Sequence, residues 1–404
     1  MLSWLYNLLL LFSGILLLLK NFSLQRLGLS IPKVKPDIWL HIASMGEMIG
    51  VKPFLDEARK SGLSFIISCM TKTGYQTAKG FGEEVFYLPL DFSFLMRRTI
   101  KKLSPKMLII SETELWPNLI RSAKKMGCSV ILINGRITEK SYRRYRVLSS
   151  LTKEVLSSFD LFLMQSEEDA KRIRGLGASC DRVKVYGNTK FDWLAIDVPS
   201  LDIDFATSNV ITFGSIREME EEAIISAFSK IQEKIPEVIG IIAPRHLERI
   251  KAISERLIEA KIPFVKRTEK PKEIQAGSIL LLDTIGELRS AYKSSSIAFV
   301  GGTLADYGGH NILEPALFGI PVLFGTHTSH FKDVSVAMKK GKAAIEVSNE
   351  KGLAKNAARL LSCEEERTLM GRRAGEVAQK FVGASTRMYL EIGKFLFSAP
   401  HDAD

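Results

Sequence analysis

DIWLHIASMGE, residues 37–47, places a short apolar run directly before a helix-start signal. The run Asp37 to Ala43 is a strand candidate, and its largely apolar character is typical of a strand buried on both faces. Ser44 and Glu47 follow with the Ser-x-x-Glu spacing of a capping box, which indicates that a helix begins there. A buried strand that leads directly into a helix is the unit of a parallel α/β sheet.

The same alternation continues on both sides of a polar stretch, Asp192 to Asn209, which is broken by Pro199. The strand candidates before this linker are Leu63 to Ser68, Val85 to Leu90, Met107 to Ser111, Ser129 to Ile133, Leu161 to Gln165 and Val183 to Tyr186. Those after it are Val210 to Phe213, Val238 to Ala243, Ser278 to Leu282, Ile297 to Val300, Val322 to Phe324 and Ala344 to Val347. We therefore expect an α/β fold with two doubly wound Rossmann-like domains, 36–195 and 205–380, facing a cleft at the carboxyl ends of their strands.

The excess of positive charge is confined to one half of the chain. Residues 1–200 contain 29 basic and 18 acidic residues, which accounts for the whole net charge of +11, whereas residues 201–404 contain 27 of each. Such an excess favours a nucleic acid, an acidic lipid or a phosphorylated substrate as partner. The four cysteines are scattered, without the spacing of a zinc site or a disulfide framework, and this fits a reducing cytosolic compartment.

Leu2 to Leu19 contains no charged side chain and is about long enough to span a bilayer, so residues 1–20 are predicted to form a membrane anchor helix. The basic residues that follow are Lys20, Arg26, Lys33 and Lys35. By the positive-inside rule they place the rest of the chain in the cytoplasm, at the inner membrane. The segment lacks the basic start and small-residue cleavage site of a secretory signal. Because the span is short, an amphipathic or core-docked helix is the alternative.

A second basic feature lies within residues 136–146. Its basic residues are Arg136, Lys140, Arg143, Arg144 and Arg146, with Tyr142 and Tyr145 between them. Basic residues interleaved with tyrosines are typical of surfaces that bind nucleic acid or anionic membrane, and a solvated helix face is the plain alternative. The preceding anchor favours the membrane, so we expect an anionic membrane surface as partner and no nucleic acid.

Polar residues cluster where predicted strands meet helices. The longer segments are HIASMGE (41–47), SETELWPN (111–118), NGRITEKS (134–141), GNTKFD (187–192) and GGTLADYGGHNILEP (301–315). Helix capping alone could explain several of their carboxylates. The pairs with capping-box spacing are Ser44 and Glu47, Ser111 and Glu114, Ser215 and Glu218, and Asn311 and Glu314.

Glycines in the last of these segments favour an anion site. Gly301-Gly302 and Gly308-Gly309 flank a polar loop before a helix that is predicted to begin near Asn311. Such a loop would offer free backbone N–H groups and the positive end of a helix dipole to a phosphate or carboxylate.

Arg245 follows a strand and a proline, where its guanidinium can bind a phosphate through two N–H groups. His246 beside it is best explained as a surface or supporting histidine. Three further histidines of the second half, His310, His327 and His330, lack the acidic company and spacing of a zinc motif. We therefore predict no metal site.

Together these segments resemble the family of Kdo transferases, where Kdo is 3-deoxy-D-manno-octulosonic acid, from about Trp39 to about Val336. The resemblance implies the GT-B arrangement of two Rossmann-like domains, with residues 381–404 as a C-terminal helix that crosses back and a tail. HIASMGE resembles the family's H-x-V-S-V-G-E and gives Glu47 the place of the general base. SETELWPN resembles M-E-T-E-L-W-P-N and GNTKFD resembles G-N/S-L-K-F-D, which gives Glu112 and Lys190 supporting roles in the transition state.

The resemblance also implies CMP contacts in the second domain, within the segments APRH, DTIGEL and GGHNILEP. These residues are Pro244, Arg245, Ile285, Gly286, Glu287, Asn311, Ile312, Leu313 and Glu314. The family's G-S-T-H-E-G-E-E loop reads GSIREMEE here, with Ile216 and Arg217 in place of the threonine and histidine. The usual R-x-R-x-G-x run between anchor and first domain is also missing.

The implied function is inverting transfer of Kdo from CMP-Kdo to a lipid A precursor, a tetra-acyl disaccharide bisphosphate, without cofactor or metal. Domain 36–195 would bind the acceptor and domain 205–380 the donor. Glu47 would be kept ionised at neutral pH by its position at a helix start. Two other interpretations remain. A GT-B enzyme that uses a UDP-sugar should not reproduce ETELWPN and GNTKFD in order. A non-enzymatic membrane or nucleic-acid binding protein would not explain the glycine loops and strand-end carboxylates.

Overall fold

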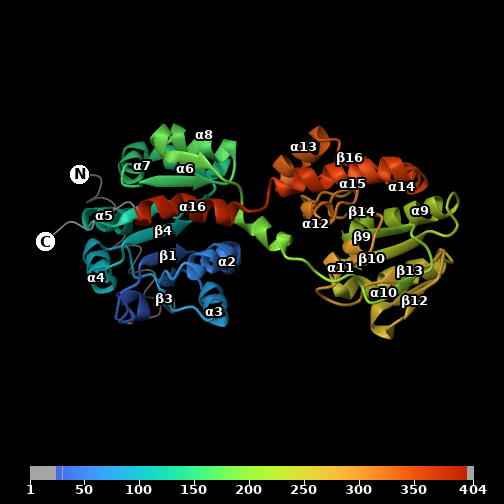
Figure 1. The fold of residues 1–404 in the computed structure, drawn as a ribbon, viewed down its shortest axis with the longest axis horizontal. Helices are drawn as coiled ribbons and strands as arrows, with labels where there is room; N and C mark the ends of the chain where they lie inside the picture. The colour runs from blue at the N-terminus through green and yellow to red at the C-terminus, as the bar shows by residue number, and fades with distance from the viewer. Residues whose placement is uncertain (1–23, 30, 398–404) are drawn as a thin grey trace. The chain divides into compact units, whose positions relative to one another are not determined.

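The computed structural model describes residues 24–29 and 31–397, which divide into two compact units (Figure 1). The first unit contains the described residues up to Trp193 together with those from Phe381 onward, and the second contains Leu194–Lys380. Each unit has its own seven-stranded parallel sheet, which confirms the predicted pair of doubly wound α/β sheets. The predicted anchor, residues 1–20, lies outside the described residues, and within residues 24–29 and 31–397 no helix is long and apolar enough to cross a membrane.

The first sheet has the strand order β3-β2-β1-β4-β5-β6-β7, with every neighbouring pair parallel. Its strands are β1 (Ile38–Ile42), β2 (Phe65–Cys69), β3 (Val85–Tyr87), β4 (Met107–Ser111), β5 (Ser129–Gly135), β6 (Leu161–Met164) and β7 (Val183–Val185). The winding direction reverses between β1 and β4, because β2 and β3 lie on one side of β1 and the later strands on the other. Ligands of doubly wound sheets bind at such a switch point, outside the carboxyl ends of the strands.

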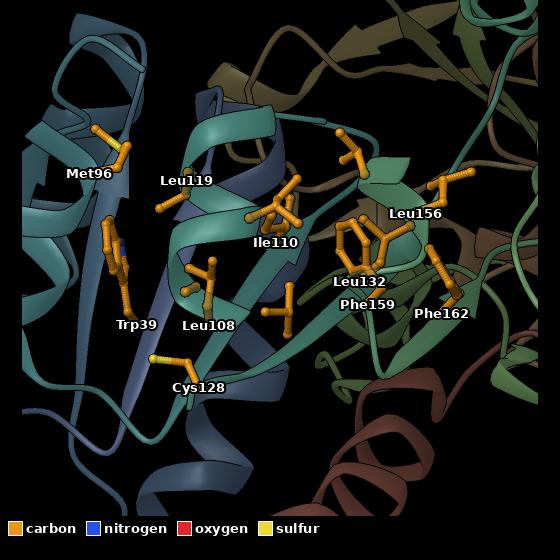
Figure 2. Packing of buried hydrophobic residues seen from close by; sticks show 14 of the residues in the cluster. Trp39, Met96, Leu108, Ile110, Leu119, Cys128, Leu132, Leu156, Phe159 and Phe162 are labelled. Carbon is orange, nitrogen blue, oxygen red and sulfur yellow. The ribbon is translucent and has the colours of Figure 1, made fainter. Parts of the chain in front are cut away.

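Helices cover both faces of this sheet, and strand residues alternate between the two cores. One face packs against α2 (Met45–Lys60), α3 (Lys72–Gly80) and α16 (Ala384–Phe397), and the other against α4 (Ser93–Leu103), α5 (Pro117–Lys125), α7 (Ser149–Leu156) and α8 (Glu167–Gly175). In β4, for example, Ile109 belongs to the first core and Leu108 to the second. Figure 2 shows part of the second core, where Met96, Leu119 and Leu156 of the helices lie over the strands. Burial on both faces explains why the strand sequences are continuously apolar.

The C-terminal helix α16 is attached to the first unit by Asp192, the last residue of the GNTKFD segment. Its carboxylate accepts hydrogen bonds from the backbone N–H groups of Gly383 (2.6 Å), Ala384 (3.1 Å) and Ser385 (2.6 Å). These N–H groups lie at the start of α16, where the helix itself supplies no acceptor for them. Farther along α16, Glu391 pairs with Lys184 of β7 at 2.5 Å. The chain therefore returns to the first sheet and completes one of its helical layers.

The second sheet has the order β11-β13-β10-β9-β14-β15-β16 and is again entirely parallel. Its strands are β9 (Val210–Ile216), β10 (Ile239–Pro244), β11 (Phe264–Lys266), β13 (Ile279–Leu281), β14 (Ile297–Val300), β15 (Val322–Phe324) and β16 (Ala344–Glu346). The helices of this unit are α9 (Glu221–Gln232), α10 (Ile250–Glu259), α11 (Leu288–Lys293), α12 (Leu313–Ala316), α13 (Lys332–Lys340), α14 (Glu350–Ser362) and α15 (Glu364–Gln379). The switch point lies between β9 and β14.

The strands β4, β14 and β15 occupy the ranges that their apolar runs predict. Three short strands were not predicted: β11, β8 (Asp204–Phe205) and β12 (Glu273–Ile274), of which the last two pair in a small separate sheet. β8 lies inside the stretch predicted as linker. Strands of two or three residues at a sheet edge contain no apolar run that could mark them.

Replacing Asp192 by alanine should release α16 from the first unit. Three N–H groups at the start of the helix lose their acceptor, and we expect a loss of about 1–3 kcal/mol of unfolding free energy. Hydrogen exchange followed by mass spectrometry should show faster exchange confined to the start of α16. The control is Asp181→Ala, which removes an exposed aspartate of the same unit; equal exchange in the two variants would contradict the anchoring role.

Candidate functional site

The predicted catalytic residues lie at the carboxyl end of the first sheet. Glu47 is in the first turn of α2, directly after β1, and Glu112 follows β4, so the two carboxylates flank the switch point. Lys190 lies after β7, in the short helix η3 (Thr189–Ala195). Its Nζ is 2.8 Å from Oε1 of Glu112. The fold thus brings Glu112 and Lys190 into contact, and the charge of Glu112 is close enough to influence Glu47.

Glu47 is buried, with 6% of its surface exposed, and it caps its own helix. Ser44 accepts a hydrogen bond from the Glu47 N–H at 3.4 Å, and the Glu47 carboxylate accepts one from the N–H of Ala43 at 2.8 Å. Burial raises the pKa of Glu47 to about 7; the nearby charges of Glu112 and Glu114 raise it further, while the Ala43 N–H opposes the shift. The expectation that the helix start keeps this carboxyl ionised is wrong, because loss of hydration outweighs the amides.

Glu112 has a backbone φ of 54°, in the left-handed region that residues other than glycine rarely adopt. The conformation is held by the hydrogen bond from its N–H to the Ile133 carbonyl (3.0 Å) and by the ion pair with Lys190. Ser111 is the last residue of β4 and α5 begins only at Pro117, so the predicted capping box of Ser111 and Glu114 is wrong. Backbone strain of this kind costs about 1–2 kcal/mol and is retained mainly at functional sites.

Three buried polar atoms beside this ion pair have no hydrogen-bond partner within the part of the chain that the structure describes. They are Ser111 Oγ, Asn134 Nδ2 and Thr189 Oγ1. Ser111 precedes Glu112, Thr189 precedes Lys190, and Asn134 Oδ1 accepts the N–H of Thr189 at 3.2 Å. Buried polar groups nearly always have a partner, so a water molecule or a substrate hydroxyl is expected here.

His41, which opens the HIASMGE segment, is a positioning residue in the core. Its Nδ1 lies 2.9 Å from Ser68 Oγ, and its Nε2 accepts a hydrogen bond from the indole N–H of Trp116 at 3.1 Å. An indole can only donate, so Nε2 carries no proton. Burial lowers the pKa of His41 to about 3, which keeps the ring neutral. This contact ties β1 to the ETELWPN loop and gives a physical reason for the two motifs to occur together.

At the switch point of the second unit, Glu220 links the loop after β9 to the loop after β14; it lies in the GSIREMEE segment, but no role was predicted for it. Its fully buried carboxylate accepts hydrogen bonds from four backbone N–H groups, those of Arg217 (3.0 Å), Gly302 (2.6 Å), Thr303 (2.8 Å) and Leu304 (2.8 Å). The amides at Gly301-Gly302 that were predicted to bind an external anion are therefore occupied by the protein itself. The capping box is formed by Arg217 and Glu220, because Ser215 of the predicted pair still belongs to β9.

The residues predicted to contact CMP lie at or after the carboxyl ends of β10, β13 and β14: Pro244 is the last residue of β10, and Leu313 and Glu314 lie in α12. Arg245 and Ile285 are exposed, Ile285 to 86%. Ile312 and Leu313 are fully buried, so their apolar side chains belong to the core and are not exposed to a ligand. Asn311 is turned onto its own loop, where Oδ1 accepts the N–H of Leu313 at 3.1 Å.

The two glutamates of this set differ in their surroundings. Glu287 accepts a hydrogen bond from Arg267 Nε at 2.9 Å and another from the Thr284 hydroxyl. Burial raises the pKa of Glu314 to about 7, and the positive charges of Arg289 and Arg245 oppose the shift. Glu314 is therefore suited to a hydrogen bond as donor or acceptor near neutral pH.

Four of the six histidines of the chain follow β10, β14 or β15. They are His246, His310, His327 and His330. Burial lowers the pKa of His310 to about 4, and the positive charges of Arg245 and Arg217 lower it further, so the ring is neutral. Across residues 24–29 and 31–397, no three His, Cys, Asp or Glu side chains are grouped so that they could hold a metal ion.

The basic stretch at 136–146 forms a solvent-exposed strip around α6 (Glu139–Val147), a helix without buried residues. Its arginines and its lysine are exposed, whereas Tyr142 and Tyr145 pack inward against the core, with the Tyr145 hydroxyl bonded to the Thr113 carbonyl at 3.1 Å. Val147, at the end of the strip, is 83% exposed. Because the tyrosines cannot stack on bases, the strip fits an acidic surface better than single-stranded nucleic acid.

Two doubly wound parallel sheets with polar loops at their carboxyl ends define an α/β fold of the GT-B type, an architecture of glycosyltransferases. A solved glycosyltransferase from Rickettsia africae is similar to this chain with a TM-score of 0.59 and 12% identity, covering 91% of this chain and 100% of that one. A likeness at this identity shows the fold alone.

The family model described as 3-deoxy-D-manno-octulosonic-acid transferase (kdotransferase) matches residues 22–193. The 3-deoxy-D-manno-octulosonic acid transferase of Haemophilus influenzae is 31% identical over 87% of this chain and 85% of its own length. A bifunctional glycosyltransferase/methyltransferase of Fusobacterium nucleatum is 34% identical over 82% of this chain, and the match spans 54% of that protein. The chain belongs to the Kdo transferase family and is a glycosyltransferase, as the resemblance predicted.

Replacing Glu220 by glutamine should destabilise the second unit. The amide group would turn N–H donors toward backbone N–H groups, and we expect a loss of about 2–4 kcal/mol of unfolding free energy. The check is urea unfolding beside Glu218→Gln, since Glu218 is an exposed neighbour whose ion pair with Arg249 should contribute less than about 1 kcal/mol. Similar transitions for the two variants would contradict the linking role of Glu220.

Proposed function

We propose that this chain transfers Kdo from CMP-Kdo to a lipid A precursor, a phosphorylated lipid, with inversion at the anomeric carbon. Membership of the Kdo transferase family supports the transferred sugar. The observation that carries the mechanism is the state of Glu47, a buried carboxyl with a pKa of about 7 at the switch point of the first sheet. A general base is most effective when its pKa lies near the working pH.

In the proposed reaction a hydroxyl oxygen of the acceptor attacks the anomeric carbon of Kdo from the side opposite the phosphate. The new C–O bond forms as the bond to the phosphate oxygen breaks, and CMP leaves with that electron pair. The hydroxyl proton passes to the carboxylate of Glu47. A displacement of this kind inverts the anomeric carbon and uses no cofactor.

Lys190 is placed to support the negative charge that develops. Its ammonium has three N–H donors, of which one is directed at Glu112, so the others are available to substrate. Gly50 of α2 makes room for it, since a Cβ at that position would lie 2.8 Å from Lys190 Cγ. The ion pair with Glu112 thus holds the lysine side chain in place, and the lack of a side chain at Gly50 leaves room for it.

On the donor side, Arg245 is the residue suited to the CMP phosphate. Its side chain is exposed at the end of β10, and among the described residues no carboxylate lies within 4.0 Å of its guanidinium. A guanidinium presents paired N–H donors that match phosphate oxygens. Its charge is therefore available to the leaving group.

Because the proposed acceptor is a lipid, we also propose that the protein works at the membrane. Residues 1–20 would anchor the chain in the inner membrane, with the catalytic units in the cytoplasm. The exposed basic strip around α6 would then contact anionic headgroups or the phosphates of the acceptor.

Glu47→Gln should lower the rate of Kdo transfer by about 10²- to 10⁴-fold and leave CMP binding almost unchanged. Because the base must be unprotonated, kcat/KM of the unaltered protein should rise with pH through about 7, following the pKa of Glu47, and level off above it. Mass spectrometry of the lipid acceptor, after incubation with CMP-Kdo, measures the product. Absence of Kdo transfer by the unaltered protein would refute the proposed function.

Asp169→Asn is a matched control. Asp169 stands at the start of α8 as Glu47 does at α2: Ser166 is the N-cap, the carboxylate accepts the N–H of Ile137 at 2.7 Å, and burial raises its pKa. The Asp169→Asn variant should have a lower free energy of unfolding but should transfer Kdo at a nearly unchanged rate. If Glu47→Gln behaves like Asp169→Asn, Glu47 is only a cap and Glu112 becomes the candidate base.

Deleting residues 1–20 should release a folded protein that still binds anionic vesicles at low salt. Binding should weaken as salt screens the basic strip, and it should weaken further in the triple variant Arg143→Glu, Arg144→Glu, Arg146→Glu. Vesicle co-sedimentation measures both effects. Equal binding to neutral and anionic vesicles at low salt would contradict the electrostatic contribution.

A further inference from the structure

Arg217 belongs to a cluster of arginine and histidine side chains in the second unit, and its geometry is well defined. The cluster lies where β9, β10, β14 and β15 end, and these are four neighbouring strands of the sheet. Its members are Arg217, Arg245, His246, His310 and His330, and the positive charges of the two arginines lower the pKa of His310 further than burial alone. Two arginine charges at one sheet edge favour an anionic ligand.

Arg217 is fixed on three sides. Its guanidinium carbon lies 4.4 Å from the ring centroid of Tyr307, and its Nη1 donates to Nε2 of His246 at 2.8 Å. Its backbone N–H is held by the buried carboxylate of Glu220 at 3.0 Å. A stacked, hydrogen-bonded guanidinium loses little freedom when it binds a ligand, so it is preorganised.

The positive charge of Arg217 has no acidic partner in the described part of the chain: no carboxylate oxygen comes within 4.0 Å of its guanidinium. The same holds for Arg245, whose N–H bonds the carbonyl of Ile216, the residue before Arg217. The two guanidinium-bearing residues are thus coupled through adjacent strand ends. The Nε2 atom of His310 is buried and has no hydrogen-bond partner among the described residues. Together with the two guanidinium groups it gives the site donors for more than one anionic group.

CMP alone carries a single phosphate, whereas CMP-Kdo carries two adjacent anions, because the anomeric carbon of an ulosonic acid bears both the phosphate oxygen and the carboxylate. We propose that Arg217 binds the carboxylate of the sugar acid while Arg245 binds the phosphate, which makes Arg217 a specificity-determining residue. This assignment rests on the proposed function. It explains how the site would reject nucleotide sugars that lack a carboxylate, since the charge of Arg217 would then remain unmatched.

The test separates sugar-acid binding from nucleotide binding. Arg217→Ala should raise KM for CMP-Kdo by about 10- to 100-fold, the loss of one charge-assisted pair of hydrogen bonds, while Kd for CMP changes by less than about twofold. Titration calorimetry with CMP and steady-state kinetics with CMP-Kdo give the two values. Tyr307→Leu should raise the same KM by a few fold, and Tyr307→Phe, which keeps the ring, should not.

The alternative outcomes are distinct. An equal loss of CMP affinity in Arg217→Ala would show that Arg217 holds the phosphate, and a rise in KM for the lipid acceptor alone would show that it holds an acceptor phosphate; either overturns the assignment and leaves Kdo transfer intact. An unaltered protein that neither binds nor uses CMP-Kdo would overturn the proposed function itself, and the role of Arg217 with it.

Discussion

A strand that is covered by helices on both faces has no solvent side, and this constraint decides where polar chemistry can occur in this chain. Every strand of both large sheets is parallel, and the cores above and below are apolar. Side chains that must meet a substrate are therefore confined to the loops after the carboxyl ends. At the two switch points the loops diverge, and there Glu47 and Glu112 in one unit, and Arg217 in the other, occupy the available positions.

The capping and catalytic interpretations of Glu47 do not exclude each other. Glu47 and Asp169 make the same type of cap in the same unit, and burial raises both pKa values. Their surroundings differ: the charges near Glu47 are the carboxylates of Glu112 and Glu114, whereas those near Asp169 are arginines. A capping carboxylate surrounded by other carboxylates keeps its proton to higher pH. The residue that caps the helix is therefore also suited to act as a base near neutral pH.

Most of the fold follows from local sequence, and much of the site does not. Long apolar runs predicted the central strands, because burial on both faces leaves that pattern, and the motifs placed Glu112 and Lys190 in one site. Three of the four partners of Glu220 lie more than 80 residues away, in backbone amides that carry no side-chain signature, so the GSIREMEE segment alone does not indicate its role. The pKa of Glu47 was misjudged for a related reason: desolvation depends on how neighbouring elements pack, while the helix start is visible locally.

The central claim is that burial of the Glu47 carboxyl, and not a bound substrate, raises its pKa to about 7. A titration of carboxyl-labelled glutamate by ¹³C NMR, with the resonance assigned by its loss in Glu47→Gln, measures that ionisation without any ligand. The account predicts a midpoint near pH 7 for Glu47, following its raised pKa. A midpoint near the ordinary glutamate value of about 4.3 would contradict it.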